Sequence, residues 1–134
     1  MTYSISANSI SKNKGSSIIK QTEINFGTTS DSADTLANPA ELFLASFSAC
    51  ILKNVERFSV ILNFEYSKAH ITVNAIRLKK PPRIDQINYI LRIYSKDSNL
   101  NINLLKKNIE KFGTIFNTVQ SSCSIIGEIK KISQ

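Results

Sequence analysis

The part of this chain that most constrains its fold is an apolar segment that begins like a helix, residues 38–50 (NPAELFLASFSAC). Asn38 suits the N-cap, Pro39 suits the first helical position, and the carboxylate of Glu41 can reach back to the cap. The helix is predicted to continue to residue 62, and it is apolar around much of its circumference. We therefore expect a buried central helix against which the rest of the chain packs.

Strands and one further helix are predicted around it. Five segments alternate apolar with polar residues or are rich in β-branched ones, and they are predicted strands: 2–10, 16–26, 66–79, 84–95 and 125–132. The first two form a hairpin, and a polar loop over 27–37 follows. A second helix starts near residue 101, and Gly113 can divide it in two. This order predicts an α+β fold of antiparallel sheet packed on long helices, in a single domain over residues 1–134.

The net charge of +7 lies entirely in residues 65–134. The basic residues are not interleaved with aromatic ones, so we expect a solvated surface rather than a nucleic-acid site. The apolar run 42–52 is too short to span a membrane, and no signal peptide is visible. A cytoplasmic location is the resulting expectation, and both thiols should be reduced there.

Cys50 lies in the first helix, where a thiol is either an inert apolar residue or a reactive centre. It comes about three turns after the helix start, too far for the helix dipole to activate it. Lys53 and Arg57 share its face and are the candidate activating cations. The residues alone favour the inert interpretation and leave the reactive one open.

The other candidate residues are fewer. Cys123 continues the apolar stripe of the second helix, four positions after Val119, although serines flank it. His70 is expected at a sheet surface or edge, and two cysteines with one histidine predict no metal site. Nothing in the sequence indicates a cofactor. Glu41 is half a turn off the face of Cys50 and about 13 Å away along the helix, so capping is favoured over catalysis unless a second copy brings its Glu41 close.

The segment from Pro39 to Cys50 resembles the P-x-E-L-L-x-A-x-x-x-x-C signature of the OsmC/Ohr family, the osmotically inducible and organic-hydroperoxide-resistance proteins. The resemblance extends from the N-terminal hairpin to Cys123. It implies an intertwined homodimer of α+β subunits with active sites at the subunit interface. It also implies a thiol peroxidase in which Cys50 is the peroxidatic cysteine, Cys123 the resolving one, and an unidentified dithiol the reductant. Phe43 and Phe47 would then favour organic hydroperoxides.

The chain departs from the family pattern at three places. Ala40 follows the proline where a glutamate is common, no arginine precedes Arg57, and Ser124 rather than proline follows Cys123. The missing arginine would have to be replaced by another cation, with these candidates: Lys12, Lys14, Lys20, Lys53 and Arg57. The alternative function is a non-enzymatic dimer that binds a small apolar ligand at the subunit interface.

Overall fold

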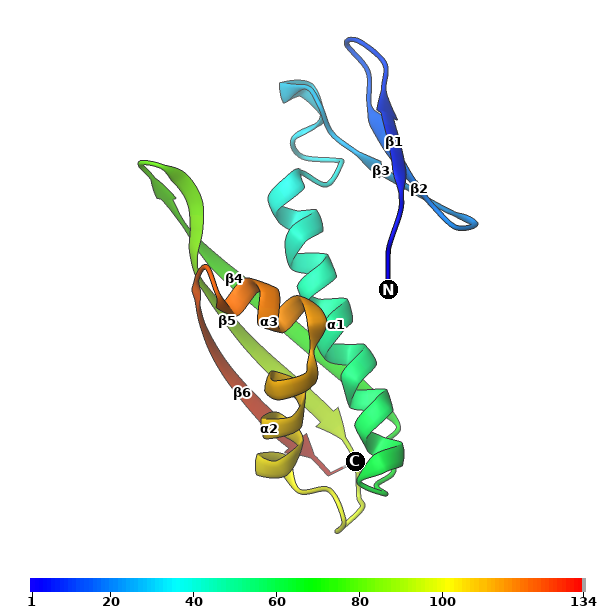
Figure 1. Cartoon of the computed structure of the whole chain (residues 1–134), viewed down its shortest axis with the longest axis vertical. Coiled ribbons are helices and arrows are strands. Elements are labelled where there is room, and N and C mark those ends of the chain that lie inside the picture. Colours follow the sequence, from blue (N-terminus) through cyan, green and yellow to red (C-terminus); the bar gives the residue numbers. More distant parts are fainter. Residues whose placement is uncertain (134) are drawn as a thin grey trace. The chain divides into compact units, whose positions relative to one another are not determined.

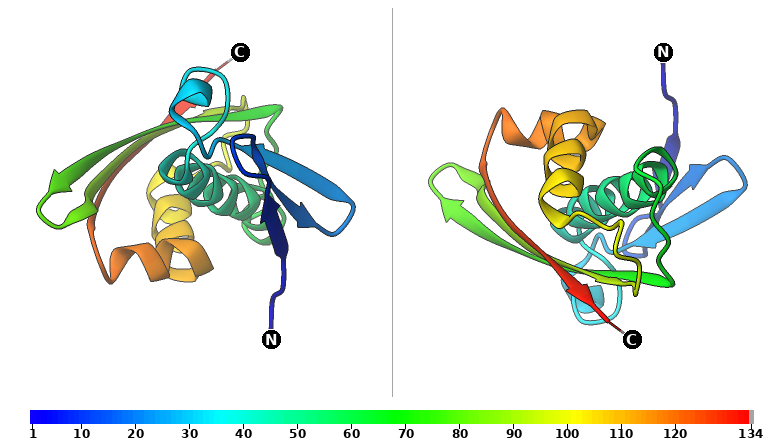
Figure 2. Two further views of the ribbon diagram at one scale, coloured as in Figure 1. Left: turned by 90° about the horizontal axis from the view of Figure 1, so that it is seen from above. Right: turned by 90° about the horizontal axis from the view of Figure 1, so that it is seen from below.

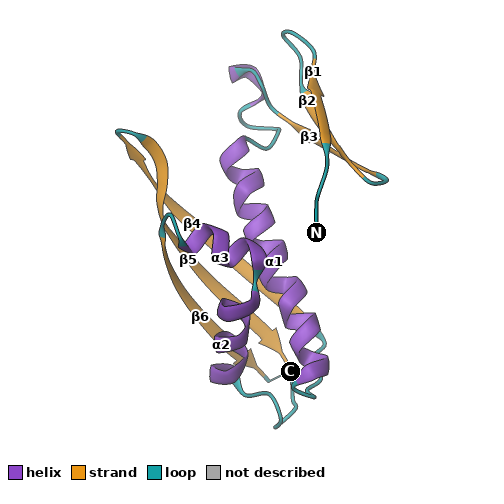
Figure 3. Cartoon of the chain, viewed as in Figure 1, coloured by secondary structure: helices purple, strands orange, loops and turns teal. Residues whose placement is uncertain are grey.

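The computed structural model describes residues 1–133. Contacts within the chain divide it into two compact units, Met1–Phe43 and Leu44–Gln134. Helices and strands of both units are shown in Figures 1 and 3. The prediction of a single domain over residues 1–134 stays a prediction. None of the described helices is both long and apolar enough to cross a membrane.

The first unit contains a three-stranded antiparallel sheet in the order β1-β2-β3. Its strands are β1 (Ser6–Ser9), β2 (Gly15–Ile19) and β3 (Thr22–Phe26). The prediction of one strand over 16–26 is wrong, because a two-residue turn at Lys20 and Gln21 reverses the chain. Lys20 has φ 55, a left-handed conformation that usually indicates glycine, so the sequence carries no signal for this turn.

The loop after β3 is mostly irregular, as predicted, apart from a short 3₁₀ helix η1 (Ser30–Ser32). An isolated bridge pairs Phe26 with Ala37 and ties the end of this loop to β3. No apolar side chain of residues 1–43 is buried, so this unit has no apolar core of its own.

Helix α1 (Pro39–Ile61) begins as the sequence predicts. Asn38 Oδ1 accepts from the Glu41 N–H at 2.8 Å, and Glu41 Oε1 accepts from the Asn38 N–H at 3.0 Å. This reciprocal capping box satisfies two backbone donors that the first helical turn leaves free. Toward its C-terminal end the helix buries a stripe of apolar residues at helical spacing: Phe47, Ile51, Val55 and Phe58.

The second unit holds a three-stranded sheet in the order β4-β5-β6. Strands β4 (Lys68–Lys79) and β5 (Pro82–Tyr94) pair antiparallel, and β6 (Ser124–Ile132) pairs parallel to β5. The α+β class is therefore as predicted, with one parallel pair in the sheet. That pair exists because α2 (Ile102–Phe112) and α3 (Thr114–Gln120) carry the chain from the end of β5 back to its start.

The break between α2 and α3 falls at Gly113, as the sequence predicts. Figure 2 shows α1, α2 and α3 on the same face of the β4-β5-β6 sheet. The core of this unit lies between the helices and that face, and its fully buried members are Phe47, Ile51, Val55, Ile87, Leu91, Ile93, Leu105 and Ile109. The core fixes where α1 presents Cys50 and where the turn after α3 presents Cys123.

Candidate active site

Cys50 lies on α1 at the edge of the buried stripe and is itself half-buried. It packs against the core and faces the junction of α2 and α3 at Gly113. A Cβ atom on Gly113 would lie 3.2 Å from Cys50 Sγ. The sulfur is thus close to the backbone of a residue that has no side chain.

The side-chain amide of Asn54 lies next to the Cys50 sulfur. Its Nδ2 donates to the Cys50 carbonyl at 2.9 Å and lies 3.8 Å from Cys50 Sγ. Asn54 is one of the few buried polar residues, so its amide is held in place by the surrounding core. The sequence places Asn54 on the face of Cys50, but only the structure shows that its donor is directed to the sulfur.

Of the two cations proposed for Cys50 from the sequence, Arg57 is engaged with aromatic rings. The guanidinium of Arg57 lies over the rings of Phe58 and Phe112, with its Cζ 5.2 and 5.9 Å from their centroids. Both contacts are within the range of a cation–π interaction. Lys53 is exposed.

Cys123 lies in the turn between α3 and β6 and is also half-buried. Its N–H and its thiol both donate to the Val119 carbonyl, at 3.1 and 3.5 Å. Burial is the largest influence on this thiol and raises its pKa; Asp85 raises the pKa as well, and the nearby Arg83 lowers it, with a net upward direction.

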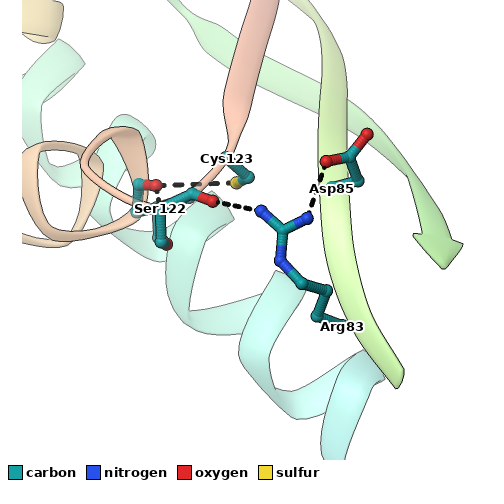
Figure 4. A network of polar contacts seen from close by, with 5 residues as sticks. Arg83, Asp85, Ser122 and Cys123 are labelled. Atoms are coloured by element: carbon teal, nitrogen blue, oxygen red, sulfur yellow. Dashed lines mark hydrogen bonds and ion pairs between the residues drawn. The ribbon is translucent and has the colours of Figure 1, made fainter. Parts of the chain in front are cut away.

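Arg83 and Asp85 stand beside Cys123 at the start of β5 (Figure 4). Arg83 Nη1 lies 2.8 Å from Asp85 Oδ1, and Nη2 donates to the Ser122 carbonyl at 2.8 Å. No sequence pattern singles out either residue. No local signal could reveal them, because Ser122 lies 39 positions after Arg83 and meets it only through the parallel pairing of β5 and β6.

The two thiols lie near different parts of α3 and form no disulfide. Cys50 faces Gly113, just before α3, and Cys123 is bonded to Val119 near the other end of α3. Helix α3 has seven residues, or about 10 Å of length at 1.5 Å per residue. Both cysteines are free.

The remaining candidates take structural positions. Glu41 holds the capping box at the start of α1, and His70 is exposed on β4 opposite Arg92. Phe47 is fully buried between Tyr89 and Phe116, so the expectation that it lines a substrate pocket is wrong. Among residues 1–133, no three His, Cys, Asp or Glu side chains form a group that could hold a metal ion.

Comparisons with solved structures show the same fold over nearly the whole chain. An OsmC-like protein from Mycoplasma pneumoniae matches with a TM-score of 0.87 and 20% identity, covering 98% of each chain. The organic hydroperoxide resistance protein OhrB of Bacillus subtilis matches with a TM-score of 0.65 and 18% identity, covering 97% of this chain and 98% of its own. An organic hydroperoxide resistance protein from Legionella pneumophila matches with a TM-score of 0.68 and 12% identity, covering 97% of each chain.

A search of curated protein sequences finds no match. The family model described as OsmC-like protein matches residues 30–127, which include both cysteines and most of the chain. On this match, and with the fold as described, the chain belongs to the family of OsmC-like proteins.

Proposed function

We propose that this protein is a thiol-dependent hydroperoxide reductase in which Cys50 is the peroxidatic and Cys123 the resolving residue. The observation that carries the proposal is the setting of Cys50, a free, half-buried thiol beside apolar core residues with the Asn54 amide 3.8 Å from its sulfur. The organic hydroperoxide resistance proteins among the structural relatives support organic hydroperoxides as the substrate class.

The proposed cycle has three steps. The Cys50 thiolate attacks the O–O bond, which breaks to leave a sulfenic acid on Cys50 and, after protonation, an alcohol. The Cys123 sulfur then displaces the sulfenic oxygen, forming a disulfide and releasing water. A dithiol reductant restores both thiols by exchange and is itself oxidised to a disulfide. Such a reductant is available in a reducing compartment, so a cytoplasmic location belongs to the proposal.

The second step requires movement, because a disulfide joins sulfurs about 2 Å apart and the thiols lie at opposite ends of α3. The segment that separates them is short, ends in a turn at 121–123, and has a break at Gly113 before it. We place the movement in this segment. Unwinding of α3 would bring Cys123 toward Cys50 while β5 keeps its place in the sheet.

We also propose that the working form is a homodimer. Residues 1–43 bury no apolar side chain, and the exposed large apolar ones are Met1, Tyr3, Ile5, Ile10, Ile18 and Phe43. In the second unit, Val60 and Ile61 at the end of α1 are 78% and 59% exposed. A second copy that covers these side chains would remove apolar area from water. Light scattering after size exclusion should give twice the mass of one chain, and a single-chain mass at micromolar concentration would contradict the dimer.

Glu41 enters the proposed reaction only from such a second copy, because its carboxylate caps its own helix. Glu41→Gln tests this, since glutamine preserves the capping box. Slower oxidation of Cys50 with unchanged unfolding free energy would support a catalytic Glu41. An unchanged rate would leave Glu41 with capping alone.

The central experiment mixes the reduced protein with cumene hydroperoxide and counts free thiols. The wild type should lose both thiols and form an intramolecular disulfide. Cys50→Ser should keep Cys123 reduced, whereas Cys123→Ser should proceed from sulfenic to sulfinic acid on Cys50. Survival of both wild-type thiols in excess peroxide would contradict the reductase and leave the ligand-binding dimer as the function to test.

A further inference from the structure

Arg83 connects the start of β5 to the turn that carries Cys123. One guanidinium nitrogen pairs with Asp85 at 2.8 Å and another donates to the Ser122 carbonyl at 2.8 Å, as Figure 4 shows. Because Ser122 directly precedes Cys123, this contact holds the backbone next to the thiol. A planar guanidinium suits the task, since it can address both oxygens at fixed angles.

The charges that act on the Cys123 thiol come from β5. Helix α3 carries no charged residue, and β6 begins with Ser124. The adjoining strands carry exposed charged residues as well, farther along β6 or on β4: Glu128, Lys130, Arg77 and Lys79. Arg83 and Asp85 therefore act on the thiol with opposite signs from the same strand.

We propose that the Arg83–Asp85 pair sets the reactivity of Cys123, with Arg83 as the positioning residue that fixes its turn and favours its thiolate. The inference rests on the proposed role of Cys123 as the resolving thiol. In that step a bond forms between the two sulfurs, the S–O bond of the Cys50 sulfenic acid breaks, and the oxygen leaves as water with the proton of Cys123. The attacking species is the thiolate, so the charges beside Cys123 control the rate of disulfide closure.

The resting state of the pair keeps Cys123 protonated. Its thiol donates to the Val119 carbonyl, and burial together with Asp85 outweighs Arg83, so that the pKa of Cys123 is raised. A protonated resolving thiol is protected from direct oxidation. Movement of the turn away from Val119 during closure would remove the carbonyl that accepts from the thiol.

The test measures Cys123 alone, in the full-length Cys50→Ser protein, where it is the sole thiol. Its alkylation rate by iodoacetamide is followed from about pH 6 to about pH 10, a range around the ordinary thiol pKa. Arg83→Gln should raise the pH midpoint of alkylation and slow the reaction at neutral pH by roughly three- to tenfold. Asp85→Asn should lower the midpoint and speed the reaction by a similar factor. Arg83→Lys should recover part of the loss because it retains the charge.

Two controls separate this electrostatic effect from simple loosening of the turn. Arg92→Gln removes a cation farther along the same strand and should leave the profile unchanged. Since the side chains of Arg83 and Asp85 are 41% and 47% exposed, added salt should shrink both shifts. If Arg83→Gln fails to fold, the downward shift in Asp85→Asn and its salt dependence decide the matter.

The inference would be overturned if Arg83→Gln and Asp85→Asn moved the pH midpoint of Cys123 alkylation in the same direction, or if neither moved it. No peroxide is used, so the outcome does not depend on whether Cys50 reduces hydroperoxides. If the two variants shift the pH midpoint of Cys123 alkylation in opposite directions but Cys50 does not react with cumene hydroperoxide, the inference about Cys123 is upheld and the proposed reductase is rejected.

Discussion

The Cys50 sulfur faces Gly113 so closely that a Cβ atom on residue 113 would lie 3.2 Å from Sγ. Gly113 has φ −75 and ψ 120, which any residue can adopt, so the glycine is required by the space around it and not by its backbone conformation. Because residue 113 has no side chain, the junction of α2 and α3 can accommodate the sulfur of the proposed peroxidatic cysteine.

Gly113→Ala should therefore destabilise the protein by about 1–2 kcal/mol, within the range for overpacking. The new methyl group would lie 3.0 Å from both the Ile109 carbonyl and Phe116 Cβ as well as close to Cys50 Sγ. Urea unfolding measures the change. In a Cys50→Ala background the cost should fall, because one of the three neighbours is removed; an equal cost in both backgrounds would deny the contact with the sulfur.

Asn54→Ala should slow the oxidation of Cys50 by cumene hydroperoxide about two- to tenfold, equivalent to the ~0.5–1.5 kcal/mol of one hydrogen bond. The variant loses the amide that lies 3.8 Å from the sulfur. Stopped-flow loss of the Cys50 thiol measures the rate. Ser59→Ala is the matched control, since it removes a buried polar group from the same helix that bonds to Glu56. Equal slowing in both variants would assign the effect to α1 as a whole.

Gly127→Ala should destabilise the protein more than Gly113→Ala does. Its expected cost in unfolding free energy is about 3 kcal/mol or more. A Cβ atom at this position of β6 would overlap the ring of Tyr89, which is 2% exposed and donates to Glu110 Oε2 at 3.1 Å. The ring cannot move without breaking that bond or the core. Thermal and urea unfolding report the loss. Tyr89→Leu in the same chain should relieve part of it, and purely additive losses would contradict the clash.

Asp97→Asn should lower stability at neutral pH, and the difference should vanish in acid. Backbone N–H groups of Asn99 and Glu65 donate to this carboxylate at 2.8 and 2.9 Å and hold its pKa below the ordinary value. A lowered folded-state pKa gives stability above the unfolded-state pKa, which is lost as the pH falls through the folded-state value. Urea unfolding at about pH 7 and about pH 2 measures both limits.

The control for this prediction is Asp34→Asn, which changes an exposed carboxylate in the loop before α1. It should alter the unfolding free energy by less than about 0.5 kcal/mol at either pH. A stability difference for Asp97→Asn that persists unchanged in acid would show that the carboxylate charge is not its cause.

Much of the secondary structure could be predicted because its signals are local. The Asn38–Glu41 capping box lies within four consecutive residues, and the interruption of the second helix at Gly113 is visible in the apolar pattern. The turn at Lys20 was missed because it has a left-handed residue that is not glycine. The parallel partner of β5 was also beyond local signals, since strand pairing depends on where α2 and α3 return the chain.

The sequence by itself determined that Cys50 lies in a capped apolar helix and that Cys123 follows a second helical stripe, because spacing along one helix is fixed by its period. Only the tertiary structure decided what surrounds each sulfur. Cys50 meets Gly113 and Asn54, Cys123 meets Val119 and the Arg83–Asp85 pair, and α3 separates them. Gly113, Arg83 and Asp85 come from distant parts of the chain, and it is the packing of helices on the β4-β5-β6 sheet that brings them to the thiols.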